Sequence, residues 1–269
     1  MDPEELELLA GTLRATMTSA ASGAALDAAL ADLGWADMLA EWPEVAIPLV
    51  FRLLGETGTH APVINDVVGT TCLPYAGGAW VAWHRDDVPG AVPGAVSGSA
   101  MELPLRRVPG PALLSPAALA AGRRAVGWWL LGSGRAMLSL ARQHALDRVQ
   151  FGRPIAAFQA VRHKLADTLV ALDGAEAVLA AAGEAAPGSE EDDLGALLAK
   201  AAAGQASLLA ARHCQQVLAG VGFTAEHGLH HHVKRVLVLD GLLGSTRELT
   251  REAGRRVVAA GAAPRLVDL

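Results

Sequence analysis

The amino-acid sequence predicts a mainly α-helical fold: a C-terminal antiparallel four-helix bundle, preceded by a small helical module and a much shortened middle β segment. A helix start at Ser115-Pro116 is followed by about thirty residues without another proline, and leucines then recur at three- and four-residue steps. Before this helix start, between Leu73 and Gly110, the sequence is rich in Gly, Pro and Ser. We therefore expect a helical module at residues 1–72, the β segment at 73–110 and the bundle domain at 111–269.

The N-terminal module begins with Asp2-Pro3-Glu4-Glu5, where a proline just inside the helix and carboxylates over the first turn favour a helix start. A second short helix is expected at about 24–33, ending at Gly34, and a third at about 44–54, ending before Gly55. In the middle segment the residues at 79–84 and 100–108 have the composition of strands.

The bundle starts with a helix predicted at 115–147, whose roughly 32 residues would span on the order of 48 Å. Gly127, Gly132 and Gly134 leave room for neighbouring helices to approach closely. The second helix carries one apolar stripe, formed by Phe158, Val161, Leu165, Leu169, Leu172 and Leu179. A polar loop at 186–193 separates it from a third helix at 194–218, and a last helix is expected at 245–260.

Composition excludes several classes of function. A formal net charge of −6 argues against general attraction to nucleic acid. We expect no run long enough to cross a membrane, and the acidic start MDPEELELL is unlike a secretory leader, so we expect a cytoplasmic protein. Cys72 and Cys214 lie far apart and suggest neither a disulfide framework nor a zinc ribbon.

Two segments carry a family resemblance. Residues 141–167, ARQHALDRVQFGRPIAAFQAVRHKLAD, closely resemble the run that joins two bundle helices in the acyl-CoA dehydrogenase family. Residues 216–226, QVLAGVGFTAE, resemble a second family segment at the right spacing, and ALADLGW is a weaker match to the family's N-terminal helical domain. The resemblance covers most of the chain except 73–110.

The resemblance implies that these segments bind FAD. A guanidinium presents a planar fork of donors that suits a phosphate oxygen, and a glycine permits a close backbone path beside a ligand. By analogy with the family, Arg148, Gln150, Phe151, Gln216 and Gly220 reach the adenosine diphosphate part of an FAD held mainly by the adjacent subunit. The alternative is a simple connector, with Arg148 at a helix end and Phe151 in the core.

The family pattern is broken at the catalytic base. Family members abstract the α-proton of an acyl-CoA with a Glu just before the last helix, and Leu243 stands at that position. Other members carry the Glu on the first long bundle helix, near Gly122, where this sequence has no carboxylate either. A leucine cannot accept a proton. The segment at 73–110 is also too short for the family's usual middle domain.

The resemblance therefore implies a shortened subunit without a catalytic residue of its own. Its partner would be a full-length acyl-CoA dehydrogenase subunit in an α2β2 assembly, acting on a CoA thioester, possibly steroid-derived, with the FAD shared at the interface. One alternative is a non-catalytic structural or binding protein of the same family. Another is a self-sufficient enzyme with a relocated base, for which Glu226 and Asp240 are the candidates.

Two other patterns invite a function. Residues 226–232, EHGLHHH, resemble a metal-binding run, although a zinc site would need a tighter constellation, and we expect no metal. Arg247, Arg251 and Arg255 form a stripe on the last helix that is either solvated or faces an acidic partner or a CoA phosphate.

Overall fold

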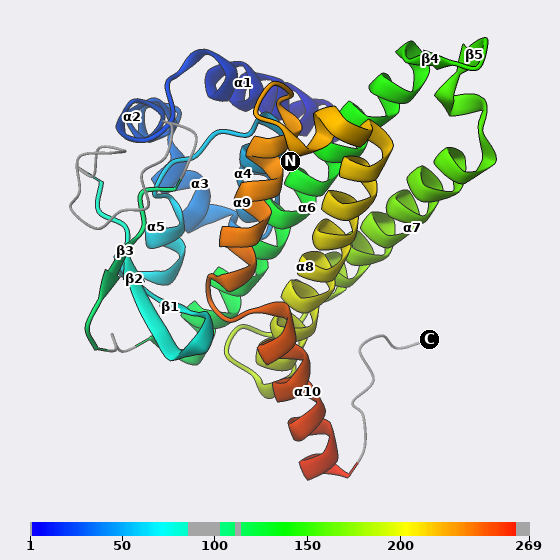
Figure 1. Cartoon of the computed structure of the whole chain (residues 1–269). Helices are drawn as coiled ribbons and strands as arrows, with labels where there is room; N and C mark the ends of the chain where they lie inside the picture. Colours follow the sequence, from blue (N-terminus) through cyan, green and yellow to red (C-terminus); the bar gives the residue numbers. More distant parts are fainter. Residues whose placement is uncertain (1, 86–102, 111–113, 262–269) are drawn as a thin grey trace.

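The computed structural model describes residues 2–85, 103–110 and 114–261. Its long helices form a bundle, and the N-terminal helices and a small sheet pack against one side of it (Figure 1). The helices are α1 (Pro3–Ser19), α2 (Ala24–Asp32), α3 (Trp35–Glu41), α4 (Pro43–Thr57), α5 (Ile64–Val68), α6 (Pro116–Asp147), α7 (Gln159–Ala181), α8 (Glu190–Leu218), α9 (Leu229–Gly241) and α10 (Thr246–Ala260). The mainly α-helical fold with a reduced β segment is confirmed.

The N-terminal module contains the predicted helices and two more. Helix α1 starts with a capping box, in which the Asp2 carboxylate accepts the Glu5 N–H and the Glu5 carboxylate accepts the Asp2 N–H. The prediction that Gly55 ends the next long helix is wrong, because α4 continues to Thr57. A Cβ on Gly55 would lie 2.4 Å from the Trp129 carbonyl oxygen, so this glycine serves a close approach to α6. Helices α3 and α5 are too short for their periodicity to predict them.

The β segment is a three-stranded antiparallel sheet of β1 (Cys72–Tyr75), β2 (Ala79–Ala82) and β3 (Arg106–Val108), in the order β1-β2-β3. The sequence predicts β2 and β3 but not β1. The start of the predicted strand at 100–108 lies outside the described residues. An isolated bridge between Tyr75 and Leu242 joins this sheet to the turn between α9 and α10.

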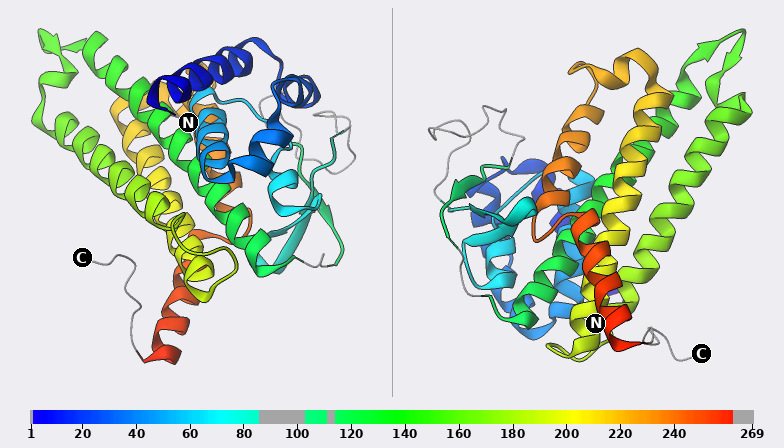
Figure 2. Two further views of the ribbon diagram at one scale, coloured as in Figure 1. Left: turned by 180° about the vertical axis from the view of Figure 1, so that it is seen from behind. Right: turned by 60° about the horizontal axis from the view of Figure 1, so that its bottom comes forward.

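The bundle consists of α6, α7, α8 and α9, which run alternately up and down (Figures 1 and 2). Helix α6 occupies the predicted span, with the Ser115 hydroxyl accepting the Ala118 N–H at 3.1 Å. Helix α8 begins at Glu190, inside the predicted polar loop, because Ser189 caps it and four acidic residues occupy its first turn. The fourth bundle helix is α9, whereas α10 forms where predicted but extends beyond the end of the bundle, packed on α8.

One hydrophobic core runs from Leu13 in α1 to Leu243 after α9, so module, sheet and bundle share it. In the stripe of α7, Leu172 and Leu179 are buried, but Leu169 is 42% exposed, contrary to the prediction of one buried stripe. Side chains at 169 and 170 lie on the outer side of α7, which no described helix covers.

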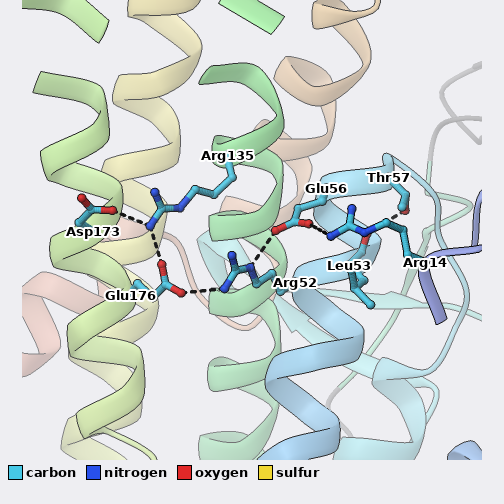
Figure 3. Close-up of polar contacts among 8 residues, drawn as sticks. All are labelled: Arg14, Arg52, Leu53, Glu56, Thr57, Arg135, Asp173 and Glu176. Carbon is cyan, nitrogen blue, oxygen red and sulfur yellow. Dashed lines mark hydrogen bonds and ion pairs between the residues drawn. The ribbon is translucent and has the colours of Figure 1, made fainter. Parts of the chain in front are cut away.

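A chain of ion pairs ties the N-terminal module to the bundle across α6 (Figure 3). Glu56 accepts from Arg14 of α1 and Arg52 of α4, Arg52 donates to Glu176 of α7 at 2.8 Å, and Glu176 and Asp173 accept from Arg135 of α6. The close crossing of α4 and α6 permits this arrangement, since a Cβ on Gly132 would lie 2.1 Å from the Arg52 carbonyl oxygen.

Among the described residues, the helical stretch Glu190–Phe223 is long and apolar enough to cross a membrane by length and composition alone. The expectation that no such run exists is therefore wrong in this respect. Within the structure 72% of its most apolar window is buried, which is typical of a central bundle helix.

Candidate functional site

The turn between α6 and α7 is a short hairpin that projects from one end of the bundle (Figure 1). Strands β4 (Val149–Gln150) and β5 (Arg153–Pro154) pair on either side of Phe151 and Gly152. Both turn residues have positive φ, 54° and 77°, as a two-residue hairpin of this kind requires. Positive φ is unusual for a phenylalanine, and the turn holds its ring 91% exposed. The alternative with Phe151 in the core is wrong.

Arg148 ends α6, and its backbone is fixed on both sides. Its N–H donates to the His144 carbonyl at 2.9 Å, and its carbonyl accepts the Ile155 N–H at 2.8 Å. Its guanidinium is exposed and makes no hydrogen bond or ion pair with any described residue. The neighbouring Gln150 uses its amide N–H on the Val149 carbonyl, which leaves the amide oxygen without a partner among the described residues.

Arg153, on the opposite strand of the hairpin, is a further residue beside the site that the sequence motif does not predict. Its guanidinium lies 4.3 Å from the centre of the Phe158 ring, and Phe151 meets the same ring edge-on at 6.1 Å. The stack stiffens the hairpin and presents a second cation at its base. A basic residue directly after Phe-Gly was the only sequence signal.

The second motif lies at the α8–η3 junction. Gln216 is exposed in the last turn of α8, and η3 (Ala219–Phe223) follows after a positive φ of 52° at Ala219. Gly220 is exposed, and a Cβ there would meet no atom within 4 Å, so its backbone is open to a ligand. Gly222 is buried, and a Cβ on it would lie 2.7 Å from the Gln215 carbonyl oxygen. Phe223 is 69% exposed.

The structure brings both motifs to the same end of the bundle (Figures 1 and 2). A contact between two histidines joins the two motifs. His144 lies one turn before Arg148, His227 lies four residues after η3, and their ring centroids are 6.4 Å apart. All five residues predicted to contact a cofactor are exposed at this end. Burial, His227 and Arg148 together lower the pKa of His144, with Asp147 acting in the opposite direction.

The two possible positions of a catalytic base lie side by side, at the opposite end of α6. A Cβ on Gly122 would lie 2.8 Å from Leu243 Cδ1 and 2.5 Å from Val68 Cγ1. Leu243 is 1% exposed, has a φ of 60°, and donates its N–H to the Pro74 carbonyl at 2.8 Å. Apolar side chains therefore fill the space in which a carboxylate would stand at either position.

Asp240, a candidate for a relocated base, is occupied by structural contacts. Its Oδ1 accepts the Thr246 N–H at 3.1 Å and the Thr246 hydroxyl. Beside it, the buried Lys200 donates to the carbonyls of Asp240 and Gly244 at 3.0 and 2.6 Å, and burial lowers the pKa of Lys200 to about 7. The other candidate, Glu226, is exposed in the segment between η3 and α9.

The two remaining sequence patterns have ordinary structural surroundings. His227 Nδ1 accepts the Leu229 N–H at 3.1 Å and so helps to start α9. Within the described ranges no group of three or more His, Cys, Asp or Glu side chains is arranged to hold a metal ion. Arg247, Arg251 and Arg255 are exposed on α10, where Arg255 pairs with Glu252.

The profile of the acyl-CoA dehydrogenase C-terminal domain matches residues 114–258, more than half of the 269 residues. The chain therefore belongs to the acyl-CoA dehydrogenase family, whose members are flavin-dependent oxidoreductases. It is 38% identical over 121 residues to acyl-CoA dehydrogenase IpdE2 of Mycobacterium tuberculosis, covering 45% of this chain and 36% of that protein. It is 37% identical over 141 residues to FadE34 of the same organism, covering 51% and 20%. The chain thus spans about a third or less of the length of these relatives.

Solved structures match over nearly the whole chain. The Tcur3481–Tcur3483 steroid ACAD variant has a TM-score of 0.71 at 20% identity, covering 97% of this chain and 99% of that one. The ChsE4–ChsE5 complex from Mycobacterium tuberculosis has a TM-score of 0.70 at 17% identity, covering 98% and 99%. These likenesses show that the fold recurs over nearly the whole length of other chains.

Members of this family bind FAD, and the hairpin end offers suitable partners for its diphosphate part. An exposed guanidinium without an ion-pair partner among the described residues matches a phosphate oxygen. The exposed ring of Phe151 and the open backbone at Gly220 match the flat and extended parts of the FAD molecule on either side of its diphosphate. The residues present therefore fit one side of a bound dinucleotide.

Proposed function

We propose that this chain is a subunit of a heteromeric FAD-dependent acyl-CoA dehydrogenase and completes the FAD site of a full-length partner subunit. The observation that carries the proposal is the contrast between the two ends of α6. At one end Arg148 and Phe151 are exposed on the hairpin that projects from the bundle. At the other end Leu243 and Gly122 leave no carboxylate and no space.

In the proposed division of labour the partner supplies the base that removes the α-proton of the thioester, and FAD, when bound, would supply the acceptor for the hydride of the β-carbon. Arg148 neutralises part of the cofactor's diphosphate charge, while Gln150 and Gln216 offer hydrogen bonds to its polar edges. Phe151 covers an apolar face and Gly220 lets the backbone approach. The chain alone is inactive, because its described residues hold no group that can take the α-proton at either family position.

The assembly is proposed to be an α2β2 heterotetramer in the cytoplasm, acting on a steroid-derived CoA thioester. Support for the pairing comes from the two solved structures that match nearly the whole chain, the Tcur3481–Tcur3483 steroid ACAD variant and the ChsE4–ChsE5 complex. The 42% exposure of Leu169 and the 69% exposure of Val170 leave apolar surface on α7 for a further subunit contact.

The test is to purify the chain alone and together with the full-length acyl-CoA dehydrogenase encoded nearest to it. We expect flavin only in the complex, and stoichiometric flavin in the single chain would contradict the proposal. In the complex, Arg148→Ala should weaken FAD binding by about 1.5 to 3 kcal/mol, or roughly tenfold or more. Arg148→Lys should recover part of the loss, since a point charge lacks the fork.

The matched control is Arg251→Ala, which removes an equally exposed arginine from α10 at the far end of the molecule. It should leave FAD binding unchanged. If Arg148→Ala also holds FAD as tightly as the unmodified complex, the hairpin is a connector and the contact with the cofactor is wrong.

The second candidate is a non-catalytic structural or binding protein of the same family. The filled space around Gly122 and Leu243 favours it, because that packing serves stability alone. The same purification separates the two functions. A stable complex that never acquires flavin, or a homo-oligomer that ignores every acyl-CoA dehydrogenase partner, supports this candidate.

A further inference from the structure

The two cofactor-facing motifs are about 70 residues apart in the sequence, yet one contact between side chains connects them. His144 lies in the last turn of α6 and His227 in the segment between η3 and α9. Their rings meet at an interplanar angle of 88°, edge against face. Neither residue belongs to the set that the family resemblance assigns to FAD.

Each histidine is also built into the backbone of its own segment. The His144 carbonyl accepts the Arg148 N–H, which fixes the start of the hairpin. The His227 Nδ1 accepts the Leu229 N–H, and the His227 carbonyl accepts from His230. The ring contact therefore joins two backbone segments that are each fixed by their own hydrogen bonds.

We propose that His144 and His227 are positioning residues that hold the hairpin and the η3 turn together as one FAD-contacting surface, and that they do so only while His144 is neutral. This inference rests on the proposed function and concerns the regulation of the same site. His227 can accept the Leu229 N–H through Nδ1 only when that nitrogen carries no proton.

The charges around the pair make acid disruptive. From α6, Arg148 opposes a proton on His144 and Asp147 favours it, and from the η3–α9 segment His227 opposes it. Burial, which is the largest cause, also lowers the pKa of His144. The charged form of His144 is therefore disfavoured, and acid places an imidazolium ion beside the Arg148 guanidinium.

The test uses the complex and four variants of this chain, one of them Arg148→Ala, with FAD affinity measured by flavin fluorescence at about pH 7.5 and about pH 5.5. His144→Ala removes the ring and should weaken FAD binding about fivefold at the higher pH, the value of one aromatic contact. His144→Phe keeps a ring without a titrating nitrogen and should restore the affinity. When the pH is lowered, the loss of FAD affinity in the His144→Phe complex should be at least about threefold smaller than the loss in the unmodified complex. The control is His163→Gln, an exposed histidine on α7 that should change neither value.

A second measurement does not depend on FAD. Hydrogen exchange of the backbone amides in residues 148–155 and 216–226 should speed up together in His144→Ala and stay slow in His144→Phe. If His144→Ala leaves both exchange and affinity unchanged, or if His144→Phe loses FAD in acid as the unmodified complex does, the inference is wrong. Should Arg148→Ala weaken FAD binding in the same experiment, the proposed function survives that failure. Should Arg148→Ala have no effect, the proposed function fails instead.

Discussion

Lys200 gives this protein a measurable dependence of stability on pH. Its side chain is fully buried in α8, and Nζ donates to two carbonyl oxygens that flank the α9–α10 turn. Burial lowers the pKa of Lys200 from 10.5 to about 7, against the attraction of Asp240. At 1.36 kcal/mol for each pH unit, this difference corresponds to roughly 5 kcal/mol between the two limiting protonation states.

The sign follows from which state holds the proton. Between about pH 7 and 10.5 the unfolded chain keeps a proton on Lys200 that the folded chain releases, so the free energy of unfolding rises with pH. Below about pH 7 both states are protonated, and this group adds no slope. From pH 7 to about 8.5 the increase should be roughly 2 kcal/mol.

The perturbation is Lys200→Met, which keeps the length of the side chain and removes the titrating nitrogen. It also leaves the carbonyls of Asp240 and Gly244 without their donor, at about 1 to 3 kcal/mol each, so the slope rather than the absolute stability is the test. Urea unfolding followed by tryptophan fluorescence at four pH values should show a rise in the unmodified protein and a flat line in Lys200→Met.

Two controls isolate the effect. Lys234→Met removes an exposed lysine from α9 and should keep the slope of the unmodified protein. Measurements stay below about pH 8.5 because burial raises the pKa of the Cys214 thiol to about 12, which makes stability fall with pH above the ordinary thiol range. Parallel profiles for Lys200→Met and the unmodified protein would refute the reasoning.

Two further predictions concern the contact between the N-terminal module and the bundle. Gly132→Ala places a Cβ 2.1 Å from a backbone carbonyl oxygen of α4 and should destabilise the protein by about 1 to 3 kcal/mol. The control Gly174→Ala places a Cβ with no atom within 4 Å and should stabilise the protein by about 0.4 to 1 kcal/mol. Thermal unfolding of both variants measures the difference. Glu56→Gln should cost about 1 kcal/mol at neutral pH. Burial alone would raise the pKa of Glu56, but its two arginine partners lower it below 4.5, so the difference from the unmodified protein should disappear as acid titrates the carboxylate.

Helix ends could be predicted where local chemistry fixes them. Ser115 and Pro116 start α6, and the turn after Asp147 ends it, as the sequence predicts. The predicted helix end at Gly55 is wrong because the sequence does not distinguish a glycine that ends a helix from a glycine that lets a neighbouring helix approach closely. Helix α9 was missed because three consecutive histidines hide the spacing of its buried Leu229, Val236 and Leu239.

The candidate site was predictable in its parts but not in its assembly. The exposed positions of Arg148 and Phe151 follow from a motif that places them on a turn. The partners of these residues do not follow, because Arg153 over Phe158 and His144 against His227 are contacts between segments that only the folded bundle brings together. Likewise, the sequence shows that Leu243 and Gly122 lack a carboxylate, whereas the structure alone shows them packed against each other.

The spacing of these features along α6 separates the apolar packing around Leu243 from the exposed hairpin. Gly122 and Arg148 are 26 positions apart on one straight helix and its cap, which corresponds to about 39 Å. At that distance apolar packing around Leu243 does not disturb the exposed hairpin, since side-chain contacts that share no partners act independently. In the proposed function, such a chain takes the base for the proton transfer from another subunit and offers Arg148 and Phe151 to that subunit's cofactor. The rigid helix between the two ends keeps the hairpin in place without any contribution from the filled base site.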